Sequence, residues 1–150
     1  SHAAADFRRL TNIESYAIGD NVSELTALIN DESWEDSYAF VLQQSHLQEK
    51  DMLLFFSVGG GDADKNISSN LVNAAKFGSK IGTKIVSVTG PSGGFLAKIS
   101  DICILIPCSD RSKLTPITEA LQAYVWHLLV SHPKLAVRKA MWESVEANAK

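Results

Sequence analysis

Residues 84–107 read KIVSVTGPSGGFLAKISDICILIP, and this stretch decides the fold. An apolar run over residues 84–89 leads into a glycine-rich turn, a short helical pattern over residues 94–99 and a second apolar run over residues 102–107. Neither run alternates apolar with polar residues, so both faces of each strand should be covered, which is typical of a parallel sheet. The stretch therefore predicts two parallel strands joined through a short helix.

The same alternation extends over the rest of the chain. A third apolar run, Met52–Val58, is also followed by glycines, and a weaker run covers Ile13–Ile18. Helical patterns lie over residues 23–29, 34–44, 69–81, 94–99 and 115–130. Strands that alternate with helices predict an α/β protein. We expect residues 1–150 to form a single domain, with a C-terminal helix over residues 134–149 after the break at Pro133.

Composition narrows the classes of function. The 150 residues carry 14 Lys+Arg against 17 Asp+Glu without a block of like charges, so we expect neither a nucleic acid nor a membrane as partner. The apolar runs are far shorter than the roughly 20 residues that a membrane-spanning helix needs. The first ten residues, SHAAADFRRL, lack the apolar centre of a signal peptide, and only two cysteines occur. We therefore expect a cytoplasmic protein.

The loop after the Met52–Val58 run is the most informative candidate site. Residues 57–68 read SVGGGDADKNIS and lie where parallel sheets bind ligands, at the carboxyl end of a strand. Glycines let backbone N–H groups approach an anion, and the following helix adds positive charge at its N-terminus, so a phosphate would fit. The chain lacks the Walker and GxGxxG fingerprints, which disfavours ATP and NAD. A glycine connection without a ligand is the alternative interpretation.

Two pairs of polar side chains have the spacing of a shared site. His2 and Asp6 are four residues apart, which places them on one side of a helix. Glu119 and His127 are eight residues apart, which leaves them about 80° apart around the long helix. Spacing alone also fits a solvated glutamate and a histidine packed beside Trp126.

Several segments resemble the SIS (sugar isomerase) domain family. Residues 89–107 resemble its strand, TG..GG turn, short helix and "aD..i.vP" strand; residues 25–31, LTALIND, resemble "LTAiaND"; and residues 50–57, KDMLLFFS, resemble "GDvLi.iS". The phosphoheptose isomerase branch, which converts sedoheptulose 7-phosphate to a heptose 7-phosphate, is the nearest. The resemblance covers nearly all of residues 1–131. It implies a three-layer α/β/α fold with a doubly wound parallel sheet in flavodoxin-like strand order.

The resemblance also implies site residues and a reaction. The phosphate-binding residues would be Ser57, Gly59, Gly60, Gly61, Ser68 and Asp31. The metal ligands would be His2, Asp6, Glu119 and His127, a set that suits zinc or a similar divalent ion. The reaction would be aldose–ketose isomerisation through an enediol, in which Asp6 moves the carbon proton and His127 serves the sugar oxygens as general acid and base.

The chain departs from the family pattern at several of these positions. The family loop is Ser-Thr-Ser-Gly-Asn-Ser, whereas Val58 replaces its threonine; Asp6 replaces a glutamate and Glu119 a glutamine. These changes favour an alternative, a non-catalytic SIS module that binds a phosphosugar or regulates a protein partner. In either case the resemblance implies a homo-oligomer, a tetramer or a dimer.

The family's N-terminal helix, first strand and Gly-Asn-Gly-Gly-Ser loop have no counterpart in this sequence. That strand would lie between the strands at Ile13–Ile18 and Met52–Ser57, and a gap there would leave unpaired backbone groups on both neighbours. We therefore expect either that the sequence is part of a longer protein or that the sheet is rearranged.

Overall fold

The computed structural model describes residues 1–139, which fall into two compact units. The larger unit is Ile18–Gln122, and the smaller unit joins Ser1–Ala17 to the chain from Ala123 onward. The predicted phosphate loop belongs to the larger unit, whereas His2, Asp6 and His127 belong to the smaller one.

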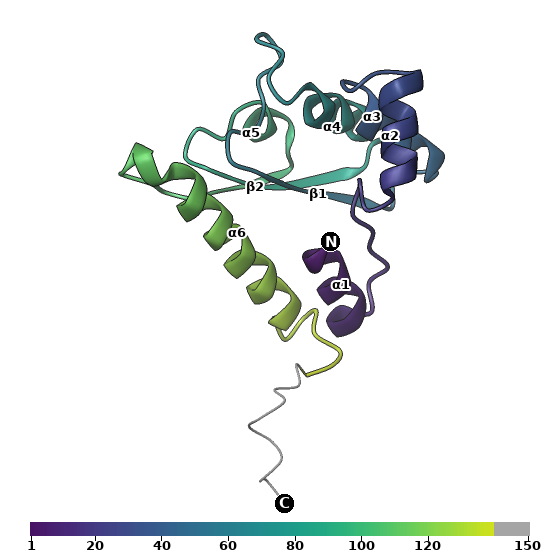
Figure 1. Cartoon of the computed structure of the whole chain (residues 1–150). Helices are drawn as coiled ribbons and strands as arrows, with labels where there is room; N and C mark the ends of the chain where they lie inside the picture. Colours follow the sequence, from purple (N-terminus) through teal and green to yellow (C-terminus); the bar gives the residue numbers. More distant parts are fainter. Residues whose placement is uncertain (140–150) are drawn as a thin grey trace, which may run out of the picture. The chain divides into compact units, whose positions relative to one another are not determined.

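The larger unit contains a parallel sheet of three strands (Figure 1). The strands are β1 (Met52–Ser57), β2 (Lys84–Thr89) and β3 (Ile102–Leu105) in the spatial order β1-β2-β3. Both pairings are parallel, with Leu53 opposite Ile85. The three long apolar runs are thus confirmed as strands, and the α/β class with a parallel sheet is confirmed with them.

The weak run at Ile13–Ile18 is not a strand, which corrects the sequence prediction. Residues 13–18 have no regular secondary structure, and Ile13 is 43% exposed. A strand persists only where a neighbour completes its hydrogen bonds, and among residues 1–139 β1 is paired with β2 alone. Ile18 instead packs against the core cluster of the larger unit.

Helices form where the patterns predicted them. They are α2 (Val22–Asp31), α3 (Ser37–Gln44), α4 (Ser69–Ile81), α5 (Leu96–Ile99), the 3₁₀ turn η2 (Arg111–Lys113) and α6 (Leu114–Ser131). Asn21 caps α2 by accepting the Glu24 N–H at 3.3 Å, and Gly82 ends α4 with a φ of 87°. Among residues 1–139, no helix combines the length and the hydropathy needed to cross a membrane.

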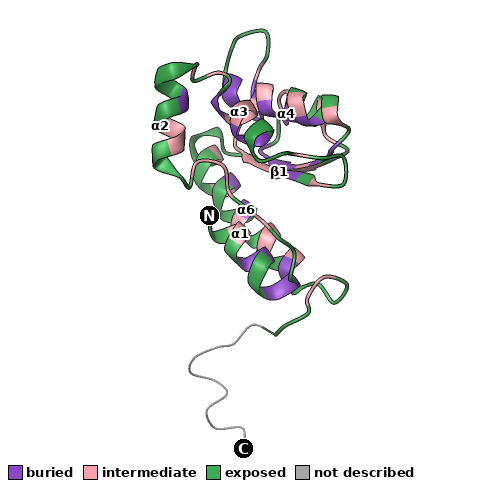
Figure 2. Cartoon of the chain, turned by 90° about the vertical axis from the view of Figure 1, so that its right-hand side faces the viewer, coloured by how far each residue is buried: buried purple, intermediate pink, exposed green. Residues whose placement is uncertain are grey.

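The core of the larger unit lies between the sheet and helices α3 and α4. It is built from the buried side chains of Leu42, Leu53, Ala74 and Ile85, and Figure 2 shows the buried segments on these elements. Gly78 allows α4 to approach β1 closely, since a Cβ atom there would lie 2.4 Å from Leu53 Cδ1. Burial of these apolar groups fixes β1 and β2, and the strands in turn fix the loops at their carboxyl ends.

The smaller unit begins with α1 (His2–Asp6), which continues into the π-helical turn η1 (Phe7–Thr11). Asn12 ends the turn in the left-handed region, and the Leu10 carbonyl accepts the N–H groups of Val137 and Arg138 at 2.8 and 3.2 Å. Residues 134–139 form turns and irregular backbone rather than the start of a helix, and the N–H groups of Val137 and Arg138 bind this distant carbonyl instead of a carbonyl one helical turn earlier. The remainder of the predicted C-terminal helix, residues 140–149, lies outside the described residues.

Candidate functional site

The Asp6 carboxylate is the centre of a polar cluster in the smaller unit. Asp6 is 5% exposed, unusually low for an acidic residue. Its Oδ2 lies 3.3 Å from His2 Nε2, 3.5 Å from His127 Nδ1 and 3.3 Å from Trp126 Nε1, while its Oδ1 lies 3.5 Å from Arg9 Nη2. Four nitrogen groups therefore surround one buried carboxylate.

Local structure explains the arrangement. The α1 helix stacks His2 and Asp6 one turn apart, and the π-helical turn that follows brings Arg9 back to the same carboxylate. Trp126 and His127 are adjacent on α6, and both reach Asp6 from there. Turns of π-helix frequently occur at functional sites.

Three of these side chains form a possible metal site. One ligand atom from each of His2, Asp6 and His127 lies within 4.8 Å of the others, and no other such group occurs among the described residues. Two imidazole nitrogens and one carboxylate oxygen are donors that suit zinc. The imidazoles are more than half exposed, whereas the carboxylate is buried, so the candidate site is open on the imidazole side.

Glu119, the fourth ligand suggested by the sequence, is not part of this group. It lies on the first half of α6, it is exposed, and it belongs to the larger unit. Its role as a ligand stays a prediction.

The glycine loop after β1 keeps part of its backbone free for an anion. Ser57 Oγ accepts the Gly60 N–H at 3.0 Å, so the hydroxyl is fixed while its own proton can be donated onward. Among the described residues, no hydrogen bond uses the N–H of Gly59 or Gly61. Ser68 precedes α4 in a left-handed conformation, and its hydroxyl does not cap the helix. These donors are compatible with phosphate binding by the loop, which stays a prediction.

The carboxylate of Asp62 accepts hydrogen bonds from another part of this loop. Asp62 Oδ1 accepts the N–H groups of Asp64 and Lys65 at 3.0 and 3.1 Å, and its Oδ2 lies 3.3 Å from Lys65 Nζ. The hydrogen bond from the Lys65 backbone is the main reason that the pKa of Asp62 is lowered. The Lys65 ammonium group is therefore paired with a carboxylate of its own loop.

The loop after β2 joins this glycine loop through the backbone. The Phe95 N–H donates to the Gly61 carbonyl at 2.8 Å, and the Leu96 N–H donates to the Gly60 carbonyl at 2.9 Å. The sequence showed two separate glycine motifs, and it contains no signal that they would bind one another. Their contact fixes the loop on which Ser57 lies.

Two buried polar residues in the first half of α6 were also missed by sequence reasoning. Gln122 donates to the Val88 carbonyl at 2.9 Å, which ties α6 to β2. Thr118 is fully buried, and its hydroxyl has no hydrogen-bond partner among the described residues. The i,i+4 spacing of these two polar residues on one helix face was the available signal.

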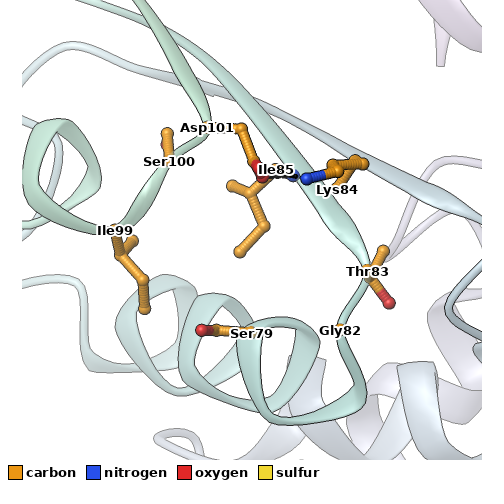
Figure 3. A pocket seen from close by; sticks show the side chains of 8 residues that line it. All are labelled: Ser79, Gly82, Thr83, Lys84, Ile85, Ile99, Ser100 and Asp101. Carbon is orange, nitrogen blue, oxygen red and sulfur yellow. Dashed lines mark hydrogen bonds and ion pairs between the residues drawn. The ribbon is translucent and has the colours of Figure 1, made fainter.

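A hollow lies at the amino ends of β2 and β3, away from the glycine loops (Figure 3). It has a volume of about 380 Å³, and Lys84 and Asp101 lie at its wall. Lys84 Nζ is 2.6 Å from Asp101 Oδ1, and Asp101 Oδ2 accepts the Ile85 N–H at 2.9 Å. Asp101 therefore joins the start of β3 to β2, and its charges are satisfied within the protein.

Comparison with known proteins finds relatives in sequence and in fold. No known family model matches the chain. The chain is 34% identical over 139 residues to the lincomycin biosynthesis protein LmbN of Streptomyces lincolnensis, covering 88% of this chain and 50% of that protein. It is 29% identical over 134 residues to the phosphoheptose isomerase of Aneurinibacillus thermoaerophilus, covering 89% of this chain and 62% of that protein. The chain thus spans about half to three fifths of the length of these relatives.

Solved structures give the same result for the fold. Phosphoheptose isomerase GmhA from Neisseria gonorrhoeae superposes with a TM-score of 0.70 at 21% identity, covering 86% of this chain and 66% of that one. The phosphoheptose isomerase of Francisella tularensis gives a TM-score of 0.68 at 23% identity, covering 85% and 66% of the two chains. The chain therefore has the α/β fold seen in phosphoheptose isomerases, and it is similar in sequence to proteins of that name.

Proposed function

We propose that the protein is a phosphosugar isomerase of the sedoheptulose 7-phosphate type. The observation that carries the proposal is the buried Asp6 carboxylate with an imidazole nitrogen at 3.3 Å and another at 3.5 Å. Aldose–ketose isomerisation needs a base for a carbon-bound proton and a second group for the oxygen-bound protons. Asp6 and His127 supply these two types of group within one cluster.

The proposed reaction balances without any further reactant. Asp6 removes a proton from C1 of the ketose, and the electron pair forms the C1–C2 double bond of an enediol while O2 gains a proton. The carbon proton returns to C2, O1 loses its proton, and the C1 carbonyl of the aldose forms. In this scheme His127 carries the proton between O1 and O2.

A divalent ion such as zinc fits the same cluster. His2, Asp6 and His127 would hold it, since their ligand atoms lie within 4.8 Å of one another. When bound, such an ion polarises a carbonyl or hydroxyl oxygen of the substrate. The chain's own contribution is to hold a buried carboxylate against two exposed imidazoles. Glu119 is proposed as a further ligand on the resemblance alone.

The glycine loop is proposed to bind the substrate phosphate. Ser57 and Ser68 offer hydroxyl groups, Gly59 and Gly61 offer N–H groups, and the start of α4 adds positive potential. Gly60 shapes the loop, and Asp31 is a further proposed contact on the resemblance alone. Binding at a phosphate remote from the reacting carbons would position the sugar. A phosphorylated sugar does not cross membranes, so the proposed site of action is the cytoplasm.

We also propose that the protein acts as a homo-oligomer, a tetramer or a dimer. Leu121, Tyr124 and Leu128 repeat along one face of α6 and are 37%, 58% and 52% exposed. The 18-residue helix contains no Asp, Lys or Arg and a single Glu, Glu119. Such an apolar face favours burial against a second copy. Sedimentation of the wild type above monomer mass, and a shift toward monomer in Leu128→Lys, would support this assignment.

A non-catalytic phosphosugar-binding or adaptor protein is the second candidate. The observation that favours it is the loop itself, where Val58 replaces a hydroxyl donor and the acidic Asp62 and Asp64 lie close to the proposed phosphate site. Carboxylates beside a phosphate weaken its binding through charge repulsion. Under this alternative the loop binds a phosphosugar without turnover.

A coupled assay with sedoheptulose 7-phosphate separates the two candidates. The isomerase proposal expects turnover that a chelator removes and that His127→Ala reduces at least 100-fold. His132→Ala is the matched control, because His132 lies just beyond the same helix and its imidazole accepts a hydrogen bond from the Lys134 N–H, away from Asp6. Binding of the sugar phosphate without turnover supports the adaptor alternative, and activity unchanged in His127→Ala contradicts the assignment of His127.

A further inference from the structure

Trp126 makes a specific polar contact that no part of the proposed chemistry uses. Its indole N–H donates to Asp6 Oδ2 at 3.3 Å, across 120 positions of sequence. The same oxygen lies 3.3 Å from His2 Nε2 and 3.5 Å from His127 Nδ1. Trp126 therefore acts on the one atom that both imidazoles approach.

The indole is suited to orienting a carboxylate. A tryptophan N–H can only donate, and it neither ligates a metal nor takes up a proton. Rotation of an aspartate carboxylate about its last torsion is soft, so its direction depends on its hydrogen-bond donors. Arg9 contacts Oδ1 at 3.5 Å from a side chain that is 57% exposed, whereas Trp126 is half-buried. Trp126, whose side chain is more restricted than that of Arg9, is therefore the donor that contacts Oδ2.

The Trp126 ring also contacts both imidazoles. Its centroid lies 5.5 Å from that of His2 with the planes inclined at 61°, and 5.1 Å from that of His127 with an inclination of 42°. Both histidine side chains are more than half exposed, so they need a neighbour to restrict their rotamers. One side chain thus touches all three possible ligands.

We infer that Trp126 is a positioning residue that holds Asp6 Oδ2 toward His2 and His127 and so prepares the three side chains to receive a divalent cation. Groups that hydrogen-bond to a metal-binding side chain fix its orientation, and their loss typically lowers metal affinity 10- to 100-fold. The inference rests on the proposed function only in taking the cluster to be a metal site.

The test compares Trp126→Phe with wild type, using the metal-free full chain. Phenylalanine keeps a ring against the two imidazoles and removes the N–H. Trp34→Phe is the matched control, because Trp34 belongs to the other unit and is 46% exposed. Its ring packs on that of Tyr38, with 6.1 Å between the ring centroids. Titration calorimetry with Zn²⁺ is expected to show at least tenfold weaker binding for Trp126→Phe and wild-type affinity for Trp34→Phe.

A thermal-unfolding cycle without metal provides a second measurement. If the indole hydrogen bond holds Asp6, the change in Tm caused by Trp126→Phe should shrink in an Asp6→Ala background. Equal Zn²⁺ affinity of Trp126→Phe and wild type overturns the inference, and so does undetectable binding by both. The inference is also overturned if the changes in Tm caused by Trp126→Phe and by Asp6→Ala simply add in the double variant. Weaker Zn²⁺ binding in the variant together with an inactive wild type would reject the isomerase proposal and leave the inference standing.

Discussion

Gly60 and Gly94 lie so close that neither has room for a side chain. A Cβ atom on Gly60 would lie 2.0 Å from the Gly93 carbonyl oxygen, and one on Gly94 would lie 2.2 Å from the Gly59 carbonyl oxygen. Both residues have positive φ, 74° and 54°. The two glycine loops at the carboxyl edge of the sheet are therefore packed backbone against backbone.

Gly60→Ala is expected to destabilise the protein strongly. The left-handed conformation costs a residue with a side chain roughly 1–2 kcal/mol, and displacing the Gly93 carbonyl adds to this. Gly59→Ala is the control in the same loop, because a Cβ there has no neighbour within 4 Å. Urea unfolding should show a loss of at least about 2 kcal/mol for Gly60→Ala and little change for Gly59→Ala. Equal stability of the two variants would contradict the close packing of the loops.

Thr118→Val is expected to stabilise the protein by about 1 kcal/mol, because it removes a buried hydroxyl that has no partner among residues 1–139. Thr89→Val is the matched control. Thr89 is equally buried, but its hydroxyl donates to the Gly90 carbonyl at 3.1 Å, so the same change should destabilise by a similar amount. Denaturant titrations of both variants test the sign, and a destabilised Thr118→Val would show that its hydroxyl has a partner.

Asp101→Asn is expected to lower Tm at neutral pH and to match wild type in acid. The Ile85 N–H, followed by the Lys84 side chain, lowers the pKa of Asp101, and Asp101 raises the pKa of Lys84. A lowered pKa stabilises the fold above the ordinary value of 3.8 and loses that effect as pH falls through the folded-state pKa. The raised pKa of Lys84 stabilises the fold at lower pH, and this stabilisation is lost as pH rises through the folded-state pKa of Lys84.

Thermal unfolding from pH 2 to pH 8 measures this difference. The difference in Tm between wild type and Asp101→Asn should be largest above about pH 5 and should disappear in acid. Glu32→Gln, at an exposed position after α2, controls for a general change in net charge. A gap that is the same at every pH would argue against the ion pair.

Asp6→Asn is expected to reduce isomerase activity at least 100-fold, because an amide cannot accept the carbon proton. The amide keeps the size of the side chain, so circular dichroism should still show a folded protein. Glu14→Gln removes an exposed carboxylate of the same unit that accepts a hydrogen bond from Tyr16. Its kcat should equal that of wild type. Retained turnover in Asp6→Asn would remove the aspartate from the proposed mechanism.

Local patterns predicted most of the secondary structure. The three long apolar runs are strands, and the five helical patterns correspond to α2–α6, because burial of an apolar face selects the period of each segment. Ile13–Ile18 is a weaker apolar run that pairs with no strand among residues 1–139, and pairing is not encoded within six residues. The i,i+4 spacing also placed His2 and Asp6 on one helix face correctly.

The sequence by itself determined which segments are strands and helices, because hydrophobic periodicity and glycine positions act within about ten residues. It also indicated His2 with Asp6 and the glycine loop as candidate groups. Only the tertiary structure brought Trp126 and His127 to Asp6 and locked Gly60 against Gly94. Those contacts join residues far apart in the chain, and the packing of whole elements, rather than any local pattern, decides which of them meet.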